Sequence, residues 1–361
     1  MLADLVDETS LRMLCWEGYD ADTIRQRFQA ATDLDLQAQT LLSDAAAAER
    51  LLDGEYRDWD IININNAYVR DCLEPAGLIE TLDEDLRATY LDSMHPVYEP
   101  LLPWSYNAAG DLIGIGQRFG PFNLVVNLDK ISRETAIDEG FGLADEPSNH
   151  GRYAILDYPD FNLFHVAIGA GLNPFVTMSE DNLASFEATA ERWFGKAVII
   201  DDDHHRLNRA LADGDISFYL SGGIYTASPA RLAGYTNIFA VTPERGPIDG
   251  KGGIVFSEIT SLLKHGQSPS LAVKFLQFML QPETAVQIAF IEGTCNPVAQ
   301  MGDPRVFEVF SKKQLQAIQW DSLERDLQHC AHYRIPPDKQ ALLGILKTVK
   351  SRHQQKPENN L

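Results

Sequence analysis

The feature of this sequence that most constrains its fold is the alternation of short apolar runs with amphipathic segments through residues 1–130. The apolar run Leu11–Cys15 precedes a segment from Asp22 whose apolar residues recur at helical spacing. The same pair returns as the run Leu34–Thr40 and the Ala-rich segment Asp44–Leu52, and the short run Asp60–Ile64 follows. Apolar strands that alternate with helices are typical of a parallel sheet covered by helices. The sequence therefore predicts an α/β fold.

A second block of the same alternation begins near Gly151, and from Gly252 the pattern returns to strands. Separate short strands are expected at Leu112–Gly116, Phe122–Asn127, Ile254–Phe256 and Ile259–Leu263. A chain of 361 residues is too long for one small core, so two domains are expected. We predict one lobe from residues 1–127 and 257–300, and another from residues 128–256 and 301–361. A cleft between two such lobes can bind a small molecule and close by hinge motion.

The charge of the chain narrows the classes of partner. Asp and Glu number 52 against 30 Lys and Arg, which gives a net charge of −22. Nucleic acids and anionic membranes require a basic surface, so neither is expected as a partner. Cationic small molecules are attracted by such a field, although solubility alone accounts for most of these carboxylates. The first residues, MLADLVDETS, lack the basic start and apolar core of a secretory signal. The chain is then either cytoplasmic or a mature form whose signal has been removed.

No motif indicates a metal site, a cofactor or catalysis. The four cysteines show neither a CxxC pair nor zinc-ligand spacing, although a Cys295–Cys330 disulfide is conceivable in an oxidising compartment. The acidic run at residues 201–205, DDDHH, is better explained as a helix cap than as a metal site. GxSxG, HExxH and Walker motifs are absent, so no catalytic residue is assigned.

The loop after the first predicted strand carries the first candidate binding residues, Trp16, Glu17 and Tyr19. Ligands of open α/β sheets bind at the carboxyl ends of the strands, where this loop is expected. An indole and a phenol beside a carboxylate suit an amine, through cation–π contact and charge-assisted hydrogen bonds. The alternative is that the Trp16 indole only fills the edge of the core.

Further candidates follow other predicted strands. Asn65 and Asn66 stand where a strand gives way to a helix, and their amides could bind a ligand or cap the helix. Arg118 and Phe119 lie in the glycine-rich stretch GIGQRFGPFN, residues 114–123. The Arg118 side chain could bind a carboxylate or phosphate, or pair with an acidic residue of the chain, while Phe119 could wall a cleft.

Two more segments complete the set. Ser221 begins a Ser-Gly-Gly turn, which could form an anion-binding nest or only a tight turn. Phe256 and Glu258 stand two residues apart and so face the same side of a strand. An aromatic ring beside a carboxylate again suits an amine, although a lone glutamate is more often solvated or paired with a basic neighbour.

Several stretches resemble the periplasmic spermidine/putrescine-binding proteins of ABC importers. They are the Trp16–Tyr19 loop, YRDWDIININNAYV (56–69), GGIVFSEITSLLK (252–264) and LAVKFLQFMLQPETAVQIA (271–289). The resemblance implies a two-lobed type II periplasmic-binding-protein fold, each lobe a sheet flanked by helices, with a hinged cleft between them. It implies a periplasmic, monomeric binder of a small amine-containing solute that serves an ABC permease in the inner membrane and needs no cofactor. Position by position it places Trp16, Tyr19, Asn65, Phe256 and Glu258 along the cleft, with Glu258 gripping an ammonium.

The sequence departs from that family in the second lobe. The acidic pair that the family uses for another amine falls at Pro159 and Asn162, although Asp157 and Asp160 lie alongside. Asp160 is kept as a candidate binding residue for that amine. A polyamine is therefore in competition with a monoamine, an amino-phosphonate or another zwitterion, whose acidic end would meet Arg118 or the Ser-Gly-Gly turn. A ligand-loaded partner for a sensor is an alternative that the sequence does not separate from transport, and an enzyme on the same scaffold is a remote one.

Overall fold

A computed structural model of the chain describes residues 10–41, 43–266 and 268–354. The first nine residues, on which the prediction about a signal rests, lie outside this part. The chain divides into two compact units, unit 1 (residues 1–119 and 256–312) and unit 2 (residues 120–255 and 313–361). The boundaries expected from the sequence were 127, 256 and 300, against 119, 255 and 312 in the structure.

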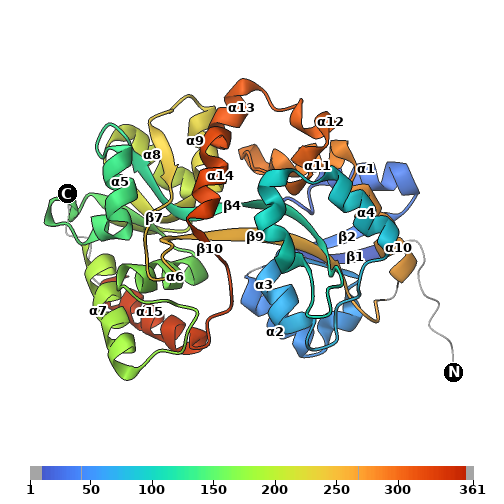
Figure 1. Cartoon of the computed structure of the whole chain (residues 1–361), viewed down its shortest axis with the longest axis horizontal. Coiled ribbons are helices and arrows are strands. Elements are labelled where there is room, and N and C mark those ends of the chain that lie inside the picture. The colour runs from blue at the N-terminus through green and yellow to red at the C-terminus, as the bar shows by residue number, and fades with distance from the viewer. Residues whose placement is uncertain (1–9, 42, 267, 355–361) are drawn as a thin grey trace. The chain divides into compact units, whose positions relative to one another are not determined.

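Unit 1 is built on a sheet whose strands run in the order β2, β1, β3, β9 (Figure 1). β1 is parallel to β2 and to β3, whereas β9 is antiparallel to β3. The strands are β1 (Ser10–Cys15), β2 (Asp35–Thr40), β3 (Ile61–Asn65) and β9 (Gly253–Leu262). The principal helices are α1 (Asp22–Thr32), α2 (Asp44–Leu52), α4 (Glu84–Ser93), α10 (Pro269–Met279) and α11 (Pro282–Ala289). The α/β prediction is confirmed.

The strand order explains why distant loops of unit 1 meet. The chain passes from β1 to β2 on one side and then returns to β3 on the other side of β1. Such a reversal is a topological switch point, where the loops after two adjacent parallel strands diverge and leave room for side chains. The loop Trp16–Tyr19 follows β1, and Asn65 ends β3, so both lie at this point.

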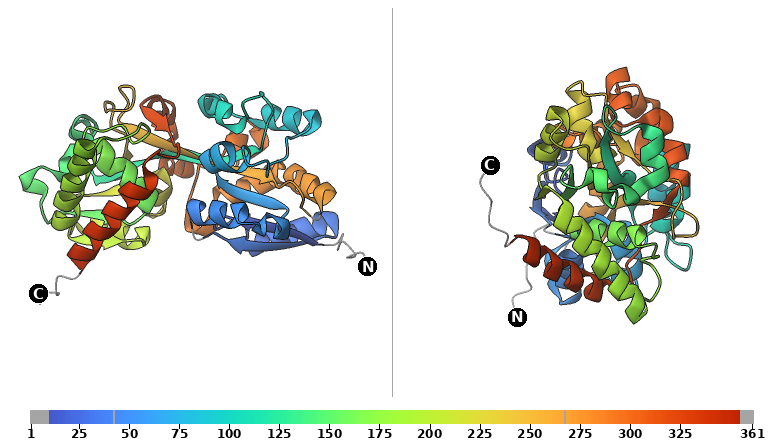
Figure 2. Two further views of the ribbon diagram at one scale, coloured as in Figure 1. Left: turned by 90° about the horizontal axis from the view of Figure 1, so that it is seen from below. Right: turned by 90° about the vertical axis from the view of Figure 1, so that its left-hand side faces the viewer.

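Unit 2 has its own helix-covered sheet. β4 is antiparallel to β7 and β8, and β5 is parallel to β7 and β6. The strands are β4 (Ile115–Asn127), β5 (Tyr153–Leu156), β6 (Ile199–Asp201), β7 (Phe218–Gly223), β8 (Ile238–Val241) and β10 (Cys330–His332). Residues 115–119 of β4 belong to unit 1. The principal helices are α5 (Arg133–Glu139), α6 (Pro159–Gly169), α7 (Glu180–Lys196), α8 (His204–Asp213), α9 (Ile224–Leu232), α14 (Trp320–Gln328) and α15 (Lys339–Gln354). α15 lies along α7 (Figure 2), where Arg352 and His353 pair with Glu191.

The prediction of four short strands around residues 112–127 and 254–263 was wrong, because β4 and β9 are each continuous. Every residue of both strands is buried, including the glycines and polar residues that looked like interruptions. A Cβ at Gly116 would lie 1.9 Å from the Tyr98 hydroxyl oxygen, so glycine is needed there for close approach and not for a turn. Ser257 Oγ is hydrogen-bonded to the same hydroxyl at 2.7 Å, which permits a polar residue inside β9.

Candidate functional site

Three segments of unit 1 are joined by one buried carboxylate, that of Asp44 at the start of α2. The indole Nε1 of Trp16 donates to Asp44 Oδ1 at 2.8 Å. The side-chain amide of Asn65 donates to Asp44 Oδ2 at 2.7 Å, and its backbone N–H to Oδ1 at 3.2 Å. The hydrogen bond to Asp44 holds the Trp16 indole in one orientation, which fits both a ligand contact and a side chain that only fills the edge of the core. Sequence reasoning missed Asp44, because an acidic residue in the first turn of a helix is ordinarily explained by the helix dipole.

The Asn65 side chain does not cap the helix that follows it. Asn65 occupies the N-cap position of α3 (Asn66–Tyr68), but its side chain makes no capping hydrogen bond. Its amide nitrogen is turned to Asp44, and its Oδ1 has no hydrogen-bond partner among the described residues. Asn65 is only 6% exposed, so this acceptor is buried. A buried acceptor without a donor is costly, and a ligand N–H or O–H group would remove that cost.

Arg118 and Glu258, each a candidate for a different ligand group, are paired with each other. Arg118 Nε lies 2.7 Å from Glu258 Oε2, and Arg118 Nη2 lies 3.2 Å from Glu258 Oε1. Nη2 also donates to the backbone carbonyl of Glu17 at 3.1 Å. Both side chains are almost wholly buried, 3% exposed for Arg118 and 11% for Glu258. The alternative that each residue meets a partner within the chain is thus realised for both.

Tyr19 lies directly against this ion pair. The Arg118 Cζ is 4.7 Å from the centre of the Tyr19 ring, which is a cation–π contact. Tyr19 itself is completely buried. Burial, with the negative charge of Glu258 as a further cause, holds the pKa of the Tyr19 phenol well above its usual range. The Tyr19 phenol is therefore neutral at any ordinary pH, and its ring packs against the Arg118–Glu258 ion pair.

We call these residues the unit 1 cluster: Trp16, Tyr19, Asp44, Asn65, Arg118 and Glu258. They come together because Asn65 of β3 is directly opposite Glu258 of β9 in the sheet. Within the cluster Asp44 and Glu258 are acidic and Arg118 is basic. Its formal charge is thus negative, and the carboxylate of Glu17 lies in the adjoining loop.

The other predicted residues of unit 1 are buried around the cluster. Asn66 is completely buried. Phe119 packs edge-to-face on Tyr98 with ring centres 5.0 Å apart, so it belongs to the core of unit 1. Phe256 is 8% exposed and precedes Glu258 by two positions on β9, as predicted.

Asp160, a candidate from unit 2, is paired within that unit. Asp160 Oδ2 accepts hydrogen bonds from the Tyr333 hydroxyl at 2.6 Å and from Lys339 Nζ at 2.8 Å. The neighbouring Asp157 is similarly paired with Lys350. Neither carboxylate therefore stands as an uncompensated anion.

Ser221, also in unit 2, is the unpaired residue of a β-bulge inside strand β7. Residues 221–223 belong to this strand, so the prediction of a Ser-Gly-Gly turn was wrong. Ser221 has a φ of +63°, and the pairing of β7 with β4 shifts register beside it. Its hydroxyl oxygen accepts a hydrogen bond from Asn162 Nδ2 at 2.8 Å and lies 2.9 Å from His165 Nδ1. The prediction of an anion nest remains a prediction, but the Ser221 hydroxyl is already engaged.

His165 was not found from the sequence, because a lone histidine in an apolar helix carries no local signal. Its Nε2 lies 2.9 Å from the carbonyl oxygen of Phe122. A carbonyl only accepts, so Nε2 carries the proton and Nδ1 accepts the hydrogen of the Ser221 hydroxyl. Complete burial lowers the pKa of His165 to about 3 and keeps the ring neutral.

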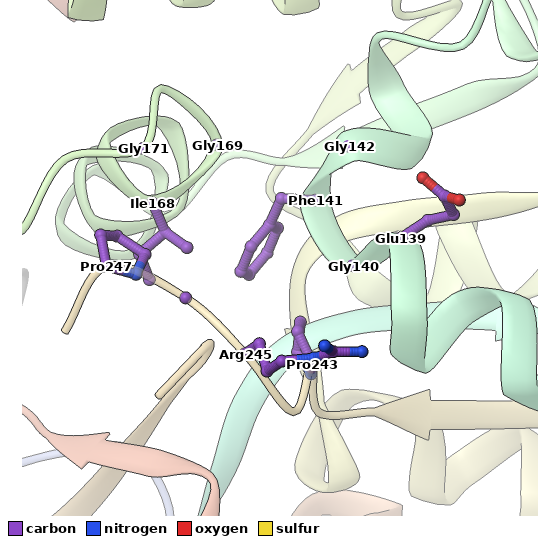
Figure 3. A pocket seen from close by; sticks show the side chains of 11 residues that line it. Glu139, Gly140, Phe141, Gly142, Ile168, Gly169, Gly171, Pro243, Arg245 and Pro247 are labelled. Atoms are coloured by element: carbon purple, nitrogen blue, oxygen red, sulfur yellow. The ribbon is translucent and has the colours of Figure 1, made fainter. Parts of the chain in front are cut away.

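Unit 2 also contains a cavity of about 460 Å³ that the sequence did not indicate. The ends of α5 and α6 and the loop after β8 form its walls (Figure 3). Its lining is mainly glycine and apolar residues, with two charged side chains, Glu139 and Arg245.

The cysteines and the acidic run at residues 201–205 have structural roles that bear on the predictions. None of Cys15, Cys72, Cys295 and Cys330 is in a disulfide, so the conceivable Cys295–Cys330 bond is not formed. Asp203 caps α8 by accepting from the backbone N–H of His205, which confirms the capping interpretation of DDDHH. No cluster suited to a metal ion occurs in the described part of the chain. None of the helices described is long and apolar enough to cross a membrane.

The chain was compared with known proteins. It matches no model of a protein family, and no curated protein matches it in sequence. A putative spermidine/putrescine ABC transporter from Listeria monocytogenes is similar in structure, with a TM-score of 0.71 and 13% identity over 96% of this chain and 99% of that chain. The spermidine/putrescine substrate-binding protein PotD from Streptococcus pneumoniae gives a TM-score of 0.67 and 15% identity over 96% and 98% of the two chains.

A binding protein for a different solute is also similar. MotA from A. tumefaciens, solved in complex with glucopine, gives a TM-score of 0.61 and 14% identity over 95% of this chain and 98% of that chain. These identities are low, so the likeness concerns the fold and not the solute. The chain has the α/β fold of the type II periplasmic solute-binding proteins of ABC transporters.

Proposed function

We propose that this chain captures a small amine-bearing solute outside the cytoplasm and delivers it to an ABC permease, without acting as an enzyme. The fold it shares with substrate-binding proteins supports the transport role. The net charge of −22 favours a cationic solute over an anionic one. The names of two similar structures add spermidine and putrescine as the first compounds to test.

One observation carries the solute class: the buried, unpartnered Oδ1 of Asn65 in a cluster of negative formal charge. An ammonium group offers N–H donors and a positive charge, and so satisfies both features at once. The Trp16 indole, fixed by Asp44, provides a flat apolar surface for the carbon chain of the solute. Phe256 is the second aromatic side chain proposed for that contact.

Binding is tested by calorimetry and thermal shift with putrescine, spermidine, propylamine, amino acids and amino-phosphonates. A solute at 100 times its Kd stabilises the native protein by about 2.7 kcal/mol, which is readily measured. Trp16→Ala should weaken the Kd of the bound amine about tenfold or more, since a large aromatic contact is lost. Trp59→Ala is the matched control, because Trp59 lies in unit 1 outside the cluster. No shift with any amine, or an unchanged Kd in Trp16→Ala, would contradict the proposal.

A zwitterionic solute is the second candidate. The observation that favours it is the range of solutes bound by proteins of this fold, since the Arg118 guanidinium is itself held by Glu258. The similar structure of MotA was solved with glucopine, so the fold accommodates solutes other than polyamines. A thermal shift with amino-phosphonates or acidic amines and none with simple amines would select this candidate. Recovery of the bound solute unchanged after incubation would agree with binding and not catalysis.

A further inference from the structure

We propose that Arg118 is a built-in cation that fills an ammonium subsite in unit 1, so that the solute is selected for having no second ammonium group there. This inference rests on the proposed function and narrows its solute class. It concerns one subsite, whose walls are Tyr19 and Glu258.

The contacts of the Arg118 head group are those an amine ligand would make. Its nitrogens meet the Glu258 carboxylate at 2.7 and 3.2 Å, its Cζ lies 4.7 Å from the Tyr19 ring centre, and Nη2 meets the Glu17 carbonyl. A carboxylate, an aromatic face and a carbonyl together are the groups that recognise a ligand cation. The carboxylate and the aromatic ring predicted to bind an amine are thus present, and the Arg118 guanidinium of the chain itself is bound to them.

The burial of the pair makes the arrangement hard to displace. Arg118 and Glu258 are 3% and 11% exposed, so separating them would leave a buried charge without its counterion. A solute ammonium would have to expel a guanidinium that is tethered and held by two hydrogen bonds to the same carboxylate. The pair therefore excludes a second ammonium group and leaves Asn65 Oδ1 as the acceptor for the first.

The same geometry places Arg118 as a specificity-determining residue and not as a carboxylate receptor. Two of its nitrogens already face Glu258, and one of these also faces a backbone carbonyl. A solute carboxylate would have to compete with Glu258 for the guanidinium nitrogens of Arg118. Removal of Arg118 should convert the subsite into one that accepts free cations.

The test is chemical rescue of Arg118→Met, which removes the charge and retains a long apolar stem. We expect methylguanidinium and putrescine to raise the Tm of Arg118→Met in a saturable way, and methylguanidinium to leave the wild-type Tm unchanged. Arg70→Met is the matched control, since Arg70 also stacks on an aromatic ring, that of Trp104, but is 37% exposed. The double variant Arg118→Met/Glu258→Gln should lose the rescue, because the carboxylate is gone.

A second readout compares solutes. The preference for putrescine over propylamine, as a ratio of Kd values, should rise about tenfold or more from wild type to Arg118→Met, as for a newly available charge pair. Equal methylguanidinium shifts in wild type, Arg118→Met and Arg70→Met would overturn the proposal.

The two proposals fail separately. If the wild type binds no amine, the proposed function fails while the methylguanidinium rescue still tests the subsite. Should Arg118→Met not fold, its refolding from urea is compared with and without methylguanidinium. If Arg118→Met refolds only when methylguanidinium is present, the subsite is supported. If it fails to refold both with and without methylguanidinium, the proposal is overturned.

Discussion

The carboxylate oxygen Oδ2 of Asp160 is shared by the hydroxyl of Tyr333, at 2.6 Å, and the ammonium of Lys339, at 2.8 Å. Tyr333 is 1% exposed and Lys339 is 8% exposed, so both donor groups are largely removed from water. The sequence predicted that Asp160 binds an amine of the solute. In the structure its carboxylate binds the ammonium of Lys339 instead.

Asp160→Asn should therefore lower the free energy of unfolding by about 2 kcal/mol, because it removes the negative charge that accepts a hydrogen bond from the buried Lys339 ammonium. The Kd for the solute should stay within about twofold. Urea unfolding and calorimetry on the same preparation measure the two quantities. Tyr333→Phe, which keeps the ion pair, should cost about 1 kcal/mol. A tenfold weaker Kd at unchanged stability would instead place Asp160 in contact with the solute.

Gly116→Ala should destabilise the protein by about 3 kcal/mol, since its Cβ would lie 1.9 Å from the Tyr98 hydroxyl oxygen. Gly344→Ala is the control: no atom lies within 4 Å of its Cβ, and it occupies the interior of α15. That change should stabilise the protein by about 0.5–1 kcal/mol through helix propensity. Thermal unfolding of both variants gives the comparison, and a neutral Gly116→Ala would show that β4 or Tyr98 moves freely.

Stability should fall as the pH drops from about 6.5 toward 3, partly because of His165. Burial lowers its pKa to about 3 in the folded protein, so between these values the unfolded chain binds the extra proton. Its stabilising contribution is present above the unfolded pKa and is lost at lower pH, with a slope of at most about 1.4 kcal/mol per pH unit. Burial also lowers the pKa of His204, to about 4, and this group adds to the same slope.

The free energy of unfolding of His165→Gln, measured from pH 4 to 7, isolates this contribution. The variant should show a shallower pH dependence than the wild type, whatever its absolute stability. His265→Gln, at an exposed position of unit 1, should keep the wild-type slope. Equal slopes in all three proteins would mean that folding does not change the pKa of His165.

Local patterns in the sequence predicted the elements of the fold but not how their side chains pair. The apolar runs and helical spacing gave β1, α1, β2 and α2 nearly to the residue, because each pattern lies within one element. The same patterns placed Trp16 at a strand end and put Phe256 and Glu258 on one face. Such predictions succeed because the side-chain period of a strand or a helix can be recognised within a few neighbouring residues.

The pairing of Arg118 with Glu258 spans 140 positions and depends on which strands become neighbours in the sheet. No window of sequence contains that information, and so each residue was assigned to a ligand group of its own. The continuity of β4 was missed for a related reason. Gly116 of β4 makes room for the Tyr98 side chain, whereas glycine in a short window of sequence is more often a sign of a turn.

The Asp44 carboxylate has a consequence for how this protein can diverge. Because its oxygens bind both Trp16 and Asn65, a mutation at any of these positions changes the environment of the others. Energies of such coupled residues are not additive, so a substitution tolerated in one lineage would be harmful in another. Homologues should therefore keep or replace the indole, the carboxylate and the amide together. Trp16, Asp44 and Asn65 should thus covary among homologues, although 49 positions of sequence separate the first from the last.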